Sequence, residues 1–263
     1  MKGDRISAGR MLAFAGRNVK EILRDPLSPV FCAGLPLAML LVLTLVDRSI
    51  PPEAGMTLFR IDRLSGGIAV FGETFLMLFL ALSVSGDRAS SFLIRLYATP
   101  MTAFDFTAGY LLPVLGLSLV QGIGVGAVSL ITAAVSGSGV KLSAAGITLL
   151  PVALLPSALF FAGLGLLFGT LFSEKAAPGL CSLVISLGSF LGGIWFDADG
   201  VGGVLLKICR CLPFYYCVKT ARAAVALDFS AEEMGTPLLI VCVSAALITV
   251  IACACFRARM RAE

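Results

Sequence analysis

The stretch from residue 86 to residue 110 reads GDRASSFLIRLYATPMTAFDFTAGY and lies between two long apolar runs, 66–86 and 109–134. It carries Arg88, Arg95, several aromatic residues and a proline. A helix needs about 20 apolar residues to cross the hydrocarbon core of a membrane, and each flanking run is long enough. The stretch is therefore predicted to be a short polar connection between two membrane-spanning helices.

The composition of the whole chain agrees with this interpretation. Of its 263 residues, 58% are hydrophobic and 14% are charged, whereas soluble domains carry about 25% charged residues. An ordinary soluble protein is thereby excluded, and a multi-pass membrane protein is indicated. No basic block resembles a nucleic-acid-binding arm, so no nucleic-acid partner is expected. The polar first 25 residues and the lack of a small-residue cleavage pattern argue against a cleavable signal peptide.

Six apolar runs are predicted to span the membrane as helices, because lipid offers no partner to free backbone groups. The runs are 28–46, 66–86, 109–134, 144–172, 178–197 and 236–256. The segment 198–235 is too polar for a seventh span and too apolar for a solvated loop. It is predicted to form a re-entrant helical hairpin that dips into the outer leaflet before the sixth span.

The expected fold is thus an all-α membrane protein in three parts. Residues 1–27 form a cytoplasmic N-terminus with an interfacial helix, 28–256 the six-span transmembrane domain, and 257–263 a cytoplasmic tail. The distribution of Lys and Arg sets this orientation, because cytoplasmic segments carry the excess of basic residues. With the N-terminus inside, the inner segments hold twelve basic residues and the longer outer segments hold eight.

Residues 7–25 (SAGRMLAFAGRNVKEILRD) are predicted to form an amphipathic helix that Pro26 ends. At helical spacing its apolar side carries Met11, Leu12, Ala15, Val19, Ile22 and Leu23, with Phe14 as the exception. Its other side carries the basic residues Arg10, Arg17, Lys20 and Arg24 together with Glu21. Such a helix is expected to lie in the membrane interface, with its basic side toward anionic lipid head groups.

A search for catalytic motifs is negative. The chain contains no histidine and no phosphate-binding G-x-x-x-x-G-K-[ST] loop, and it shows no pair of carboxylates within a span. No metal site and no cofactor of its own is expected, and the chain is not expected to be an enzyme. One ionisable residue, Glu73, lies in a span. It is interpreted either as a polar contact on a transport path or as a residue paired with Arg60 or Arg63 or reached by head-group water.

Small residues and cysteines suggest two further features. Three glycine pairs spaced four apart, 122/126, 165/169 and 188/192, are predicted to let helix backbones approach closely. Cys209, Cys211 and Cys217 cluster outside a clear span, and Cys217 is the better disulfide partner for either of the others, because Cys-x-Cys bridges have poor geometry.

The 86–110 stretch resembles the cytoplasmic loop of ABC type-2 transporter permeases, whose pattern runs approximately E-R-E-x-G-T-x-E-R-L-x-x-T-P. Its matching residues are Asp87, Arg88, Arg95, Leu96, Thr99 and Pro100. The chain departs from that pattern at Ser90, Ser91 and Ile94. The run GLGLLFGTLFSEKAAPGLCSLVISLGSFLGGIWF resembles the fourth and fifth spans of the family, and CLPFYYCVKTARAAV resembles its L-P-x-x-Y-x-x-x-x-x-R element through Leu212, Pro213, Tyr216 and Arg222.

The resemblance implies a permease that forms one half of a transmembrane pair, with an identical or a sister chain. It also implies two partner ATPase subunits that bind ATP and Mg²⁺, because this chain has no phosphate loop. The loop 87–101 would then seat as a coupling helix in the ATPase, with a second contact at 173–175. The residues expected to couple to the ATPase are Asp87, Arg88, Arg95, Leu96, Tyr97, Thr99, Pro100, Met101, Glu174 and Lys175.

The substrate path would run between the two permease halves, lined by the second and fifth spans. Its expected residues are Glu73, Phe75, Phe79, Phe190, Trp195 and Phe196. A narrow apolar path suits export of hydrophobic or amphiphilic compounds, such as drugs, antibiotics, lipids or peptides, from a bacterial or archaeal cell through its inner or plasma membrane. The alternatives are export of a polysaccharide or lipid-linked glycan, and a secondary transporter that needs no ATPase.

Overall fold

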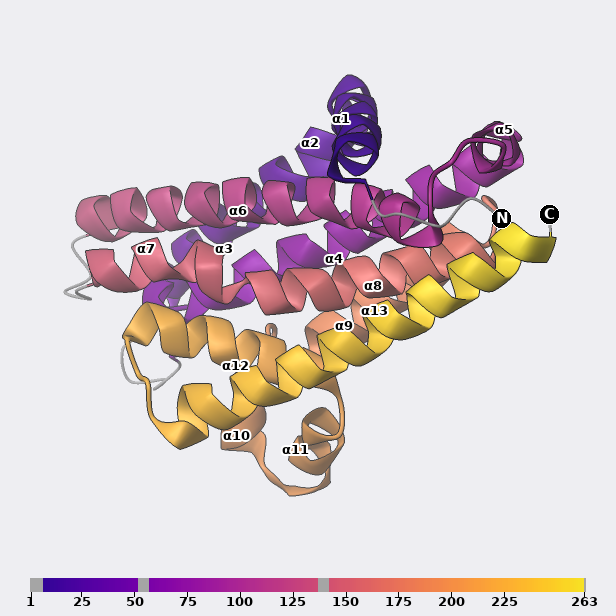
Figure 1. Ribbon diagram of the computed structural model, residues 1–263. Helices are drawn as coiled ribbons and strands as arrows, with labels where there is room; N and C mark the ends of the chain where they lie inside the picture. The colour runs from indigo at the N-terminus through magenta and orange to yellow at the C-terminus, as the bar shows by residue number, and fades with distance from the viewer. Residues whose placement is uncertain (1–6, 52–56, 137–141, 263) are drawn as a thin grey trace.

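The computed structural model of the chain describes residues 7–51, 57–136 and 142–262. Every regular element within these ranges is a helix, which confirms the predicted all-α class. The long helices lie side by side in one bundle (Figure 1). Parts of the predicted segments 1–27, 47–65 and 135–143 lie outside the described residues, and Lys141 is among them.

In the described part of the N-terminal half, six helical elements precede the long third span. They are α1 (Ala8–Arg24), α2 (Leu27–Pro29), the π-helix η1 (Val30–Gly34), α3 (Leu35–Ser49), α4 (Ile61–Ala89) and α5 (Phe92–Tyr97). The remaining elements are α6 (Ala103–Ser136), α7 (Ala144–Ala153), α8 (Leu155–Leu171), α9 (Ala177–Leu191), α10 (Ala198–Val201), α11 (Gly203–Arg210), α12 (Pro213–Ala226), the π-helix η3 (Ala231–Gly235) and α13 (Thr236–Ala262).

Five helical stretches within the described residues are long and apolar enough to cross a membrane, one fewer than the six runs predicted. They are Val30–Ser49, Ile61–Ala89, Ala103–Val135, Ala144–Leu171 and Ala231–Met260. The remaining run became α9, which is apolar but has only 15 residues. At 1.5 Å per residue it is about 22 Å long, less than the roughly 30 Å of the hydrocarbon core.

The early end of α9 has a local cause at Gly193. This residue has φ +71°, the left-handed conformation that glycine adopts without a steric penalty. The amide of Gly193 donates to the carbonyl of Phe190, and the amide of Ile194 donates to the carbonyl of Ser189. These two bonds form a Schellman motif, which satisfies the last helical carbonyls and stops the helix. Residues 194–197, predicted to be helical, therefore lie beyond its end.

Helix α4 forms the centre of the bundle and is buried along most of its length. Its closest neighbour is α8, where Gly165 and Gly169 face it. A side chain at Gly165 would overlap the carbonyl of Met77, and a Cβ at Gly169 would lie 2.7 Å from the carbonyl oxygen of Ala81. The predicted close approach of backbones at this glycine pair is therefore confirmed.

The segment 198–235 folds into short helices, as predicted. Helix α12 is buried against α4, and a Cβ at Gly66 would lie 2.8 Å from the backbone nitrogen of Arg222. The Arg222 side chain reaches back to the end of α9, donating to the carbonyls of Gly193 at 3.0 Å and Arg63 at 3.2 Å. Helix α11, in contrast, stands away from the bundle (Figure 1), and Val204 on it is largely exposed. Cys209, Cys211 and Cys217 are free thiols.

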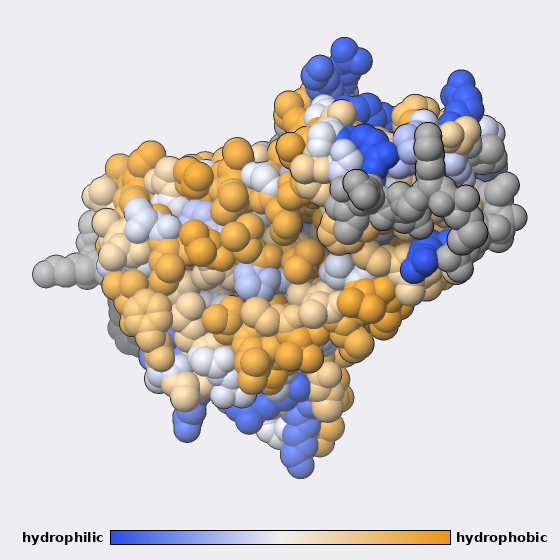
Figure 2. All heavy atoms as spheres, viewed as in Figure 1, coloured by the Kyte–Doolittle hydropathy of each residue, from blue (hydrophilic) through white to orange (hydrophobic). Residues whose placement is uncertain are grey.

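The surface of the bundle is apolar along the helices and hydrophilic near two places. Figure 2 shows hydrophobic residues over α6, α8 and α13, with hydrophilic residues gathered near α1 and α5 and again near α10 and α11. Exposed leucines and valines along α3 and α13, such as Leu45, Leu247 and Val250, belong to this apolar surface. A surface of this kind is expected for helices that face lipid.

Candidate functional site

Helix α5 connects α4 to α6 and lies at the end of the bundle where α13 also ends, here called the α5 end (Figure 1). Ser91, with φ 56°, turns the chain between α4 and α5. Leu96, Tyr97 and Met101 are half-buried and pack against the core. Arg95, by contrast, is exposed. The short helix is thus seated on the bundle along one side and presents a basic side chain on the other.

Five aromatic rings from four helices form the seat of α5, here called the aromatic cluster. They are Phe14 of α1, Tyr97 of α5, Phe106 and Tyr110 of α6, and Phe256 of α13. The ring of Phe14 lies edge-on to Tyr110 at 4.9 Å, and Tyr97 lies edge-on to Phe106 at 5.8 Å. Edge-to-face rings at these distances attract one another beyond their buried area. The aromatic cluster therefore connects α5 to α1, α6 and α13.

Asp87, in the last turn of α4, ties that helix to α1. Its carboxylate accepts two hydrogen bonds from the Arg17 guanidinium, at 2.5 and 2.6 Å, and a third from the Tyr110 hydroxyl at 2.7 Å. The Arg17 guanidinium also lies 4.3 Å from the ring centroid of Phe92, in α5. Asp87 is only 5% exposed, so its charge needs partners inside the protein, which Arg17 and Tyr110 provide. Asp87, predicted to couple to the ATPase, therefore points into the protein, toward Arg17 and Tyr110.

A second buried carboxylate, Asp105, fastens the beginning of α1. It belongs to a capping box at the start of α6, in which the Thr102 amide donates to Asp105 at 2.9 Å and the Asp105 amide donates to the Thr102 hydroxyl at 3.1 Å. The Ser7 amide donates to the same carboxylate at 3.2 Å, and Arg10 lies 3.8 Å from it. Arg10 also donates to the Pro100 carbonyl. The chain after α5 is thereby bound to α1.

Arg88 joins the α4–α5 turn to the α8–α9 turn. Its guanidinium donates to the carbonyls of Gly169, at 2.8 Å, and Phe172, at 3.1 Å, at the end of α8. A cation at a helix C-terminus satisfies free carbonyls and interacts favourably with the helix dipole. Glu174 and Lys175, which follow in the next turn, are exposed beside it. Both predicted contact regions therefore lie together at the α5 end.

Helix α1 forms over Ala8–Arg24, close to its predicted range, but its inner side differs from the prediction. Phe14, the residue outside the predicted apolar side, is buried, and so is Asn18, which donates to the Gly109 carbonyl at 3.0 Å. Leu12 and Leu23, predicted on the apolar side, are each 59% exposed. The helix therefore has three sides, one packed on α6, one apolar and open, and one charged.

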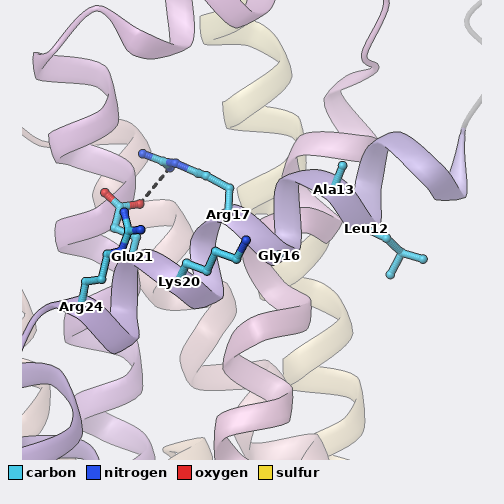
Figure 3. Close-up of a pocket in the computed structure, with 7 residues that line it drawn as sticks. All are labelled: Leu12, Ala13, Gly16, Arg17, Lys20, Glu21 and Arg24. Atoms are coloured by element: carbon cyan, nitrogen blue, oxygen red, sulfur yellow. Dashed lines mark ion pairs between the residues drawn. The ribbon is translucent and has the colours of Figure 1, made fainter.

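The charged side of α1 is drawn in Figure 3. Arg17 forms an ion pair with Glu21 at 2.9 Å, while Lys20 and Arg24 are exposed and Leu12 points away from them (Figure 3). Burial raises the pKa of the Glu21 carboxyl, and the negative charge of Asp87 raises it further, while Arg17 opposes the shift. Of the four predicted interfacial basic residues, two therefore remain on the open surface, and Arg10 and Arg17 turn toward the protein.

The residues predicted to line a substrate path fall into separate groups. Phe75 and Trp195 are linked through Phe71, whose ring lies 5.2 Å from the first and 5.3 Å from the second. The predicted pair Phe190 and Phe196 makes its own contact at 4.9 Å. Phe79 lines a hollow near α1 together with Glu21 and Glu174. Glu73 joins none of these groups, because it points toward α6 and bonds to Ser118 at 3.0 Å.

Sequence patterns did not identify several residues that build the site. Asp105, Phe106, Tyr110 and Phe256 were absent from the predicted set, and Phe71 was absent from the predicted path. A signal existed for Asp105, because Thr102 and Asp105 have the spacing of a capping box at the start of an apolar run. Phe14 was visible as an aromatic residue outside the helical pattern, which now marks it as a contact to another helix.

Several helices long and apolar enough to cross a membrane, with a short helix held at one end of the bundle between two of them, indicate an integral membrane protein. A family model described as ABC-2 type transporter matches residues 10–225, from α1 into α12. The chain therefore belongs to the ABC-2 type transporter family, whose members are transmembrane subunits that associate with ATP-binding-cassette ATPases. No curated protein matches the chain significantly.

Proposed function

We propose that this chain is the permease subunit of an ATP-driven exporter of hydrophobic or amphiphilic compounds. The observation that carries the proposal is the construction of the α5 end. Helix α5 is seated on the aromatic cluster, while Arg95 remains exposed and the α8–α9 turn lies alongside through Arg88. A helix that receives force from a partner needs these two properties, an accessible surface and a rigid connection to the spans.

ATP and Mg²⁺ would be bound by two partner ATPase subunits, since the sequence contains no phosphate-binding loop. Exposed Arg95 and the partly buried Tyr97 and Met101 suit a groove that combines acidic and apolar residues. Thr99, which donates to the Leu96 carbonyl at 2.6 Å, closes the end of α5 before Pro100. Glu174 and Lys175 would supply the second, smaller contact.

Nucleotide binding in the ATPases would shift the equilibrium between two arrangements of the permease. Displacement of α5 would move α4 directly, because the turn at Ser91 is short, and would move α1 through Arg17 and Asp87. The aromatic cluster would carry the same movement to α13. The cargo would pass between this chain and a second permease chain, identical or sister, along a surface that includes Phe71, Phe75 and Trp195.

In this arrangement the α5 end faces the cytoplasm of a bacterial or archaeal cell, and both termini lie on that side. Helix α1 would lie in the inner interface, with Lys20 and Arg24 toward lipid phosphates and exposed Leu12 and Leu23 toward the acyl chains. Helix α9 would be the fifth of six spans, followed by a re-entrant α11–α12 hairpin in the outer leaflet before α13, the sixth. Burial of α12 against α4 supports this, because backbone at membrane depth must be covered by protein.

The test is an uncoupling experiment with the double variant Arg95→Glu/Pro100→Gly. The permease is co-expressed with the candidate ATPase, co-purified and reconstituted into liposomes, and ATP hydrolysis and export of a fluorescent amphiphile are measured together. We expect the variant to insert normally but to lose export, because the new charge and the looser turn disrupt seating in the ATPase. The control is Arg48→Glu, a matched exposed arginine in the last turn of α3. Normal export by the double variant, or by a permease without any ATPase, would contradict the proposal.

A further inference from the structure

Glu73 is a fully buried carboxyl group in the middle of α4, with 0% of its surface exposed. The arginines considered as its partners in the sequence are engaged elsewhere, since Arg60 pairs with Asp62 at 3.0 Å and Arg63 with Asp197 at 3.7 Å. Glu73 instead faces α6 and α8, which contribute hydroxyl groups. The protonation state of the Glu73 carboxyl group is therefore determined by neutral hydroxyl groups and not by an arginine partner.

The hydrogen bonds around Glu73 suit a neutral acid better than a carboxylate. Ser118 of α6 donates to Oε1 at 3.0 Å. Ser157 of α8 also lies within hydrogen-bonding reach of the carboxyl group, but its own hydroxyl proton is donated to the Leu154 carbonyl at 2.8 Å. Oε2 is buried and receives no hydrogen bond from the described residues. Oε2 is therefore the oxygen that could carry a proton, and Ser157, whose own proton is already donated, can offer only a lone pair to the carboxyl group.

Among the residues that the structure describes, the groups that surround Glu73 supply no positive charge. Helix α12 contributes Cys217, which is buried and close enough to interact electrostatically with Glu73. Helix α6 contributes Gln121, one turn from Ser118, whose amide donates to the Ala69 carbonyl at 2.9 Å. Arg222, further along α12, directs its guanidinium to the carbonyls of Arg63 and Gly193. A carboxylate without a cation or sufficient donors in a buried membrane site is strongly unfavourable.

We propose that Glu73 is a proton-binding site, in which the neutral acid carries its proton on Oε2 and donates it to the Ser157 hydroxyl oxygen. The proton joins α4 to α8, and the Ser118 bond joins α4 to α6. When the helices separate and water enters, the O–H bond breaks, the electron pair stays on the carboxylate and the proton passes to water. Proton binding depends only on the helix packing, whereas release during transport rests on the proposed function.

The site is tested on the purified permease alone by infrared difference spectroscopy between wild type and the Glu73→Gln variant. Gln keeps the shape of the neutral acid, accepts from Ser118 and can donate to Ser157. We expect the difference spectrum at neutral pH to show the loss of one carbonyl band of a protonated, buried carboxylic acid. Glu174→Gln, which changes an exposed glutamate at the α8–α9 turn, is the matched control and should leave that band in place. A spectrum without the loss would overturn the proposal.

Two further measurements protect the test against a variant that fails to fold. Ser157→Ala retains Glu73 but removes the proposed acceptor, so the acid carbonyl band should shift in frequency; an unchanged band would contradict the arrangement. The thermal midpoint of the wild type should decrease as the pH is raised above the range in which a free glutamate ionises, because the folded protein retains a proton that the unfolded chain has already released. The Glu73→Gln variant should lose this part of the decrease, and identical pH profiles would also overturn the proposal. None of these readouts involves an ATPase, so they fail or succeed independently of the export experiment.

Discussion

Arg17 and Asp87 are 70 residues apart in the sequence, yet two charge-assisted hydrogen bonds of 2.5 and 2.6 Å join the α1 side chain to the last turn of α4. The Tyr110 hydroxyl adds a third bond to the same carboxylate. Asp87 is thus the point where α1, α4 and α6 meet, directly before α5. The family motif assigned Asp87 to the partner contact, but in the structure its carboxylate is buried and holds α1 and α6 to the end of α4.

Replacing Asp87 with Asn is expected to destabilise the protein by about 2–3 kcal/mol, because hydrogen bonds to charged groups contribute about 1.5–3 kcal/mol and Arg17 would lose its charged partner. The free energy of unfolding, measured by denaturant titration in detergent, checks this. Tyr110→Phe removes only one of the three bonds and should cost about 1 kcal/mol.

The matched control for Asp87→Asn is Arg24→Gln, which removes an exposed charge from the same helix that carries Arg17. Surface changes of this kind usually alter stability by less than about 0.5 kcal/mol. A double-mutant cycle of Arg17→Gln and Asp87→Asn should show strong coupling between the two sites. Additive effects would mean that the two side chains do not stabilise each other.

Arg88→Gln is expected to lower stability by about 1–2 kcal/mol, since the carbonyls of Gly169 and Phe172 would lose a cationic donor at the end of α8. The same variant should increase protease cleavage in the 173–176 turn, which follows directly. Limited proteolysis of the purified permease measures this, with Arg95→Gln as the control, because Arg95 is exposed on α5. Equal cleavage in both variants would rule out a connecting role for Arg88.

The fold class could be predicted because every residue of a membrane span meets the same apolar environment. The required length and apolarity of a span are therefore visible as runs in the sequence. Runs of apolar residues therefore located the long helices. The exception was α9, where the apolar run continued through Trp195 and Phe196 but the helix ended at Gly193. Apolar sequence indicates the environment of a segment. It does not show where a single residue with a left-handed backbone conformation ends the helix.

The site could be predicted only in part, for a different reason. The R-L-x-x-T-P motif located α5, because this information is local. The partners of its neighbours come from distant positions, such as Arg17 for Asp87 and Ser118 for Glu73, and spacing along the chain does not determine which helices pack together. Glu73 and Phe75 were placed on one path because both lie in the second predicted span. On a helix, residues two apart lie on different sides.

Gly169→Ala is expected to destabilise the protein by about 1–3 kcal/mol, because the added methyl group would press against α4 at Ala81 and Val84. Gly116→Ala, on α6, is the matched control, since nothing lies within 4 Å of the position of its Cβ. That change should be neutral or stabilising by up to about 1 kcal/mol, as alanine is the better helix former. Thermal unfolding in detergent measures both. A loss of stability in the control as large as that in Gly169→Ala would show that the α4–α8 approach is not the cause.

Gly193→Ala should cost about 1–2 kcal/mol, the penalty for a side chain in the left-handed conformation. Gly193→Asn should cost less, because Asn tolerates this conformation better. Gly179→Ala, within α9 and with open space around its Cβ, provides the control for adding a methyl group to this segment.

The apolar sequence after Gly193 favours a longer helix, but Arg222 binds the Gly193 carbonyl and holds the turn. We therefore expect Gly193→Ala combined with Arg222→Gln to lengthen α9, which cysteine accessibility at residues 194–197 can detect. Unchanged accessibility in that double variant would mean that the turn is maintained by something other than these two residues.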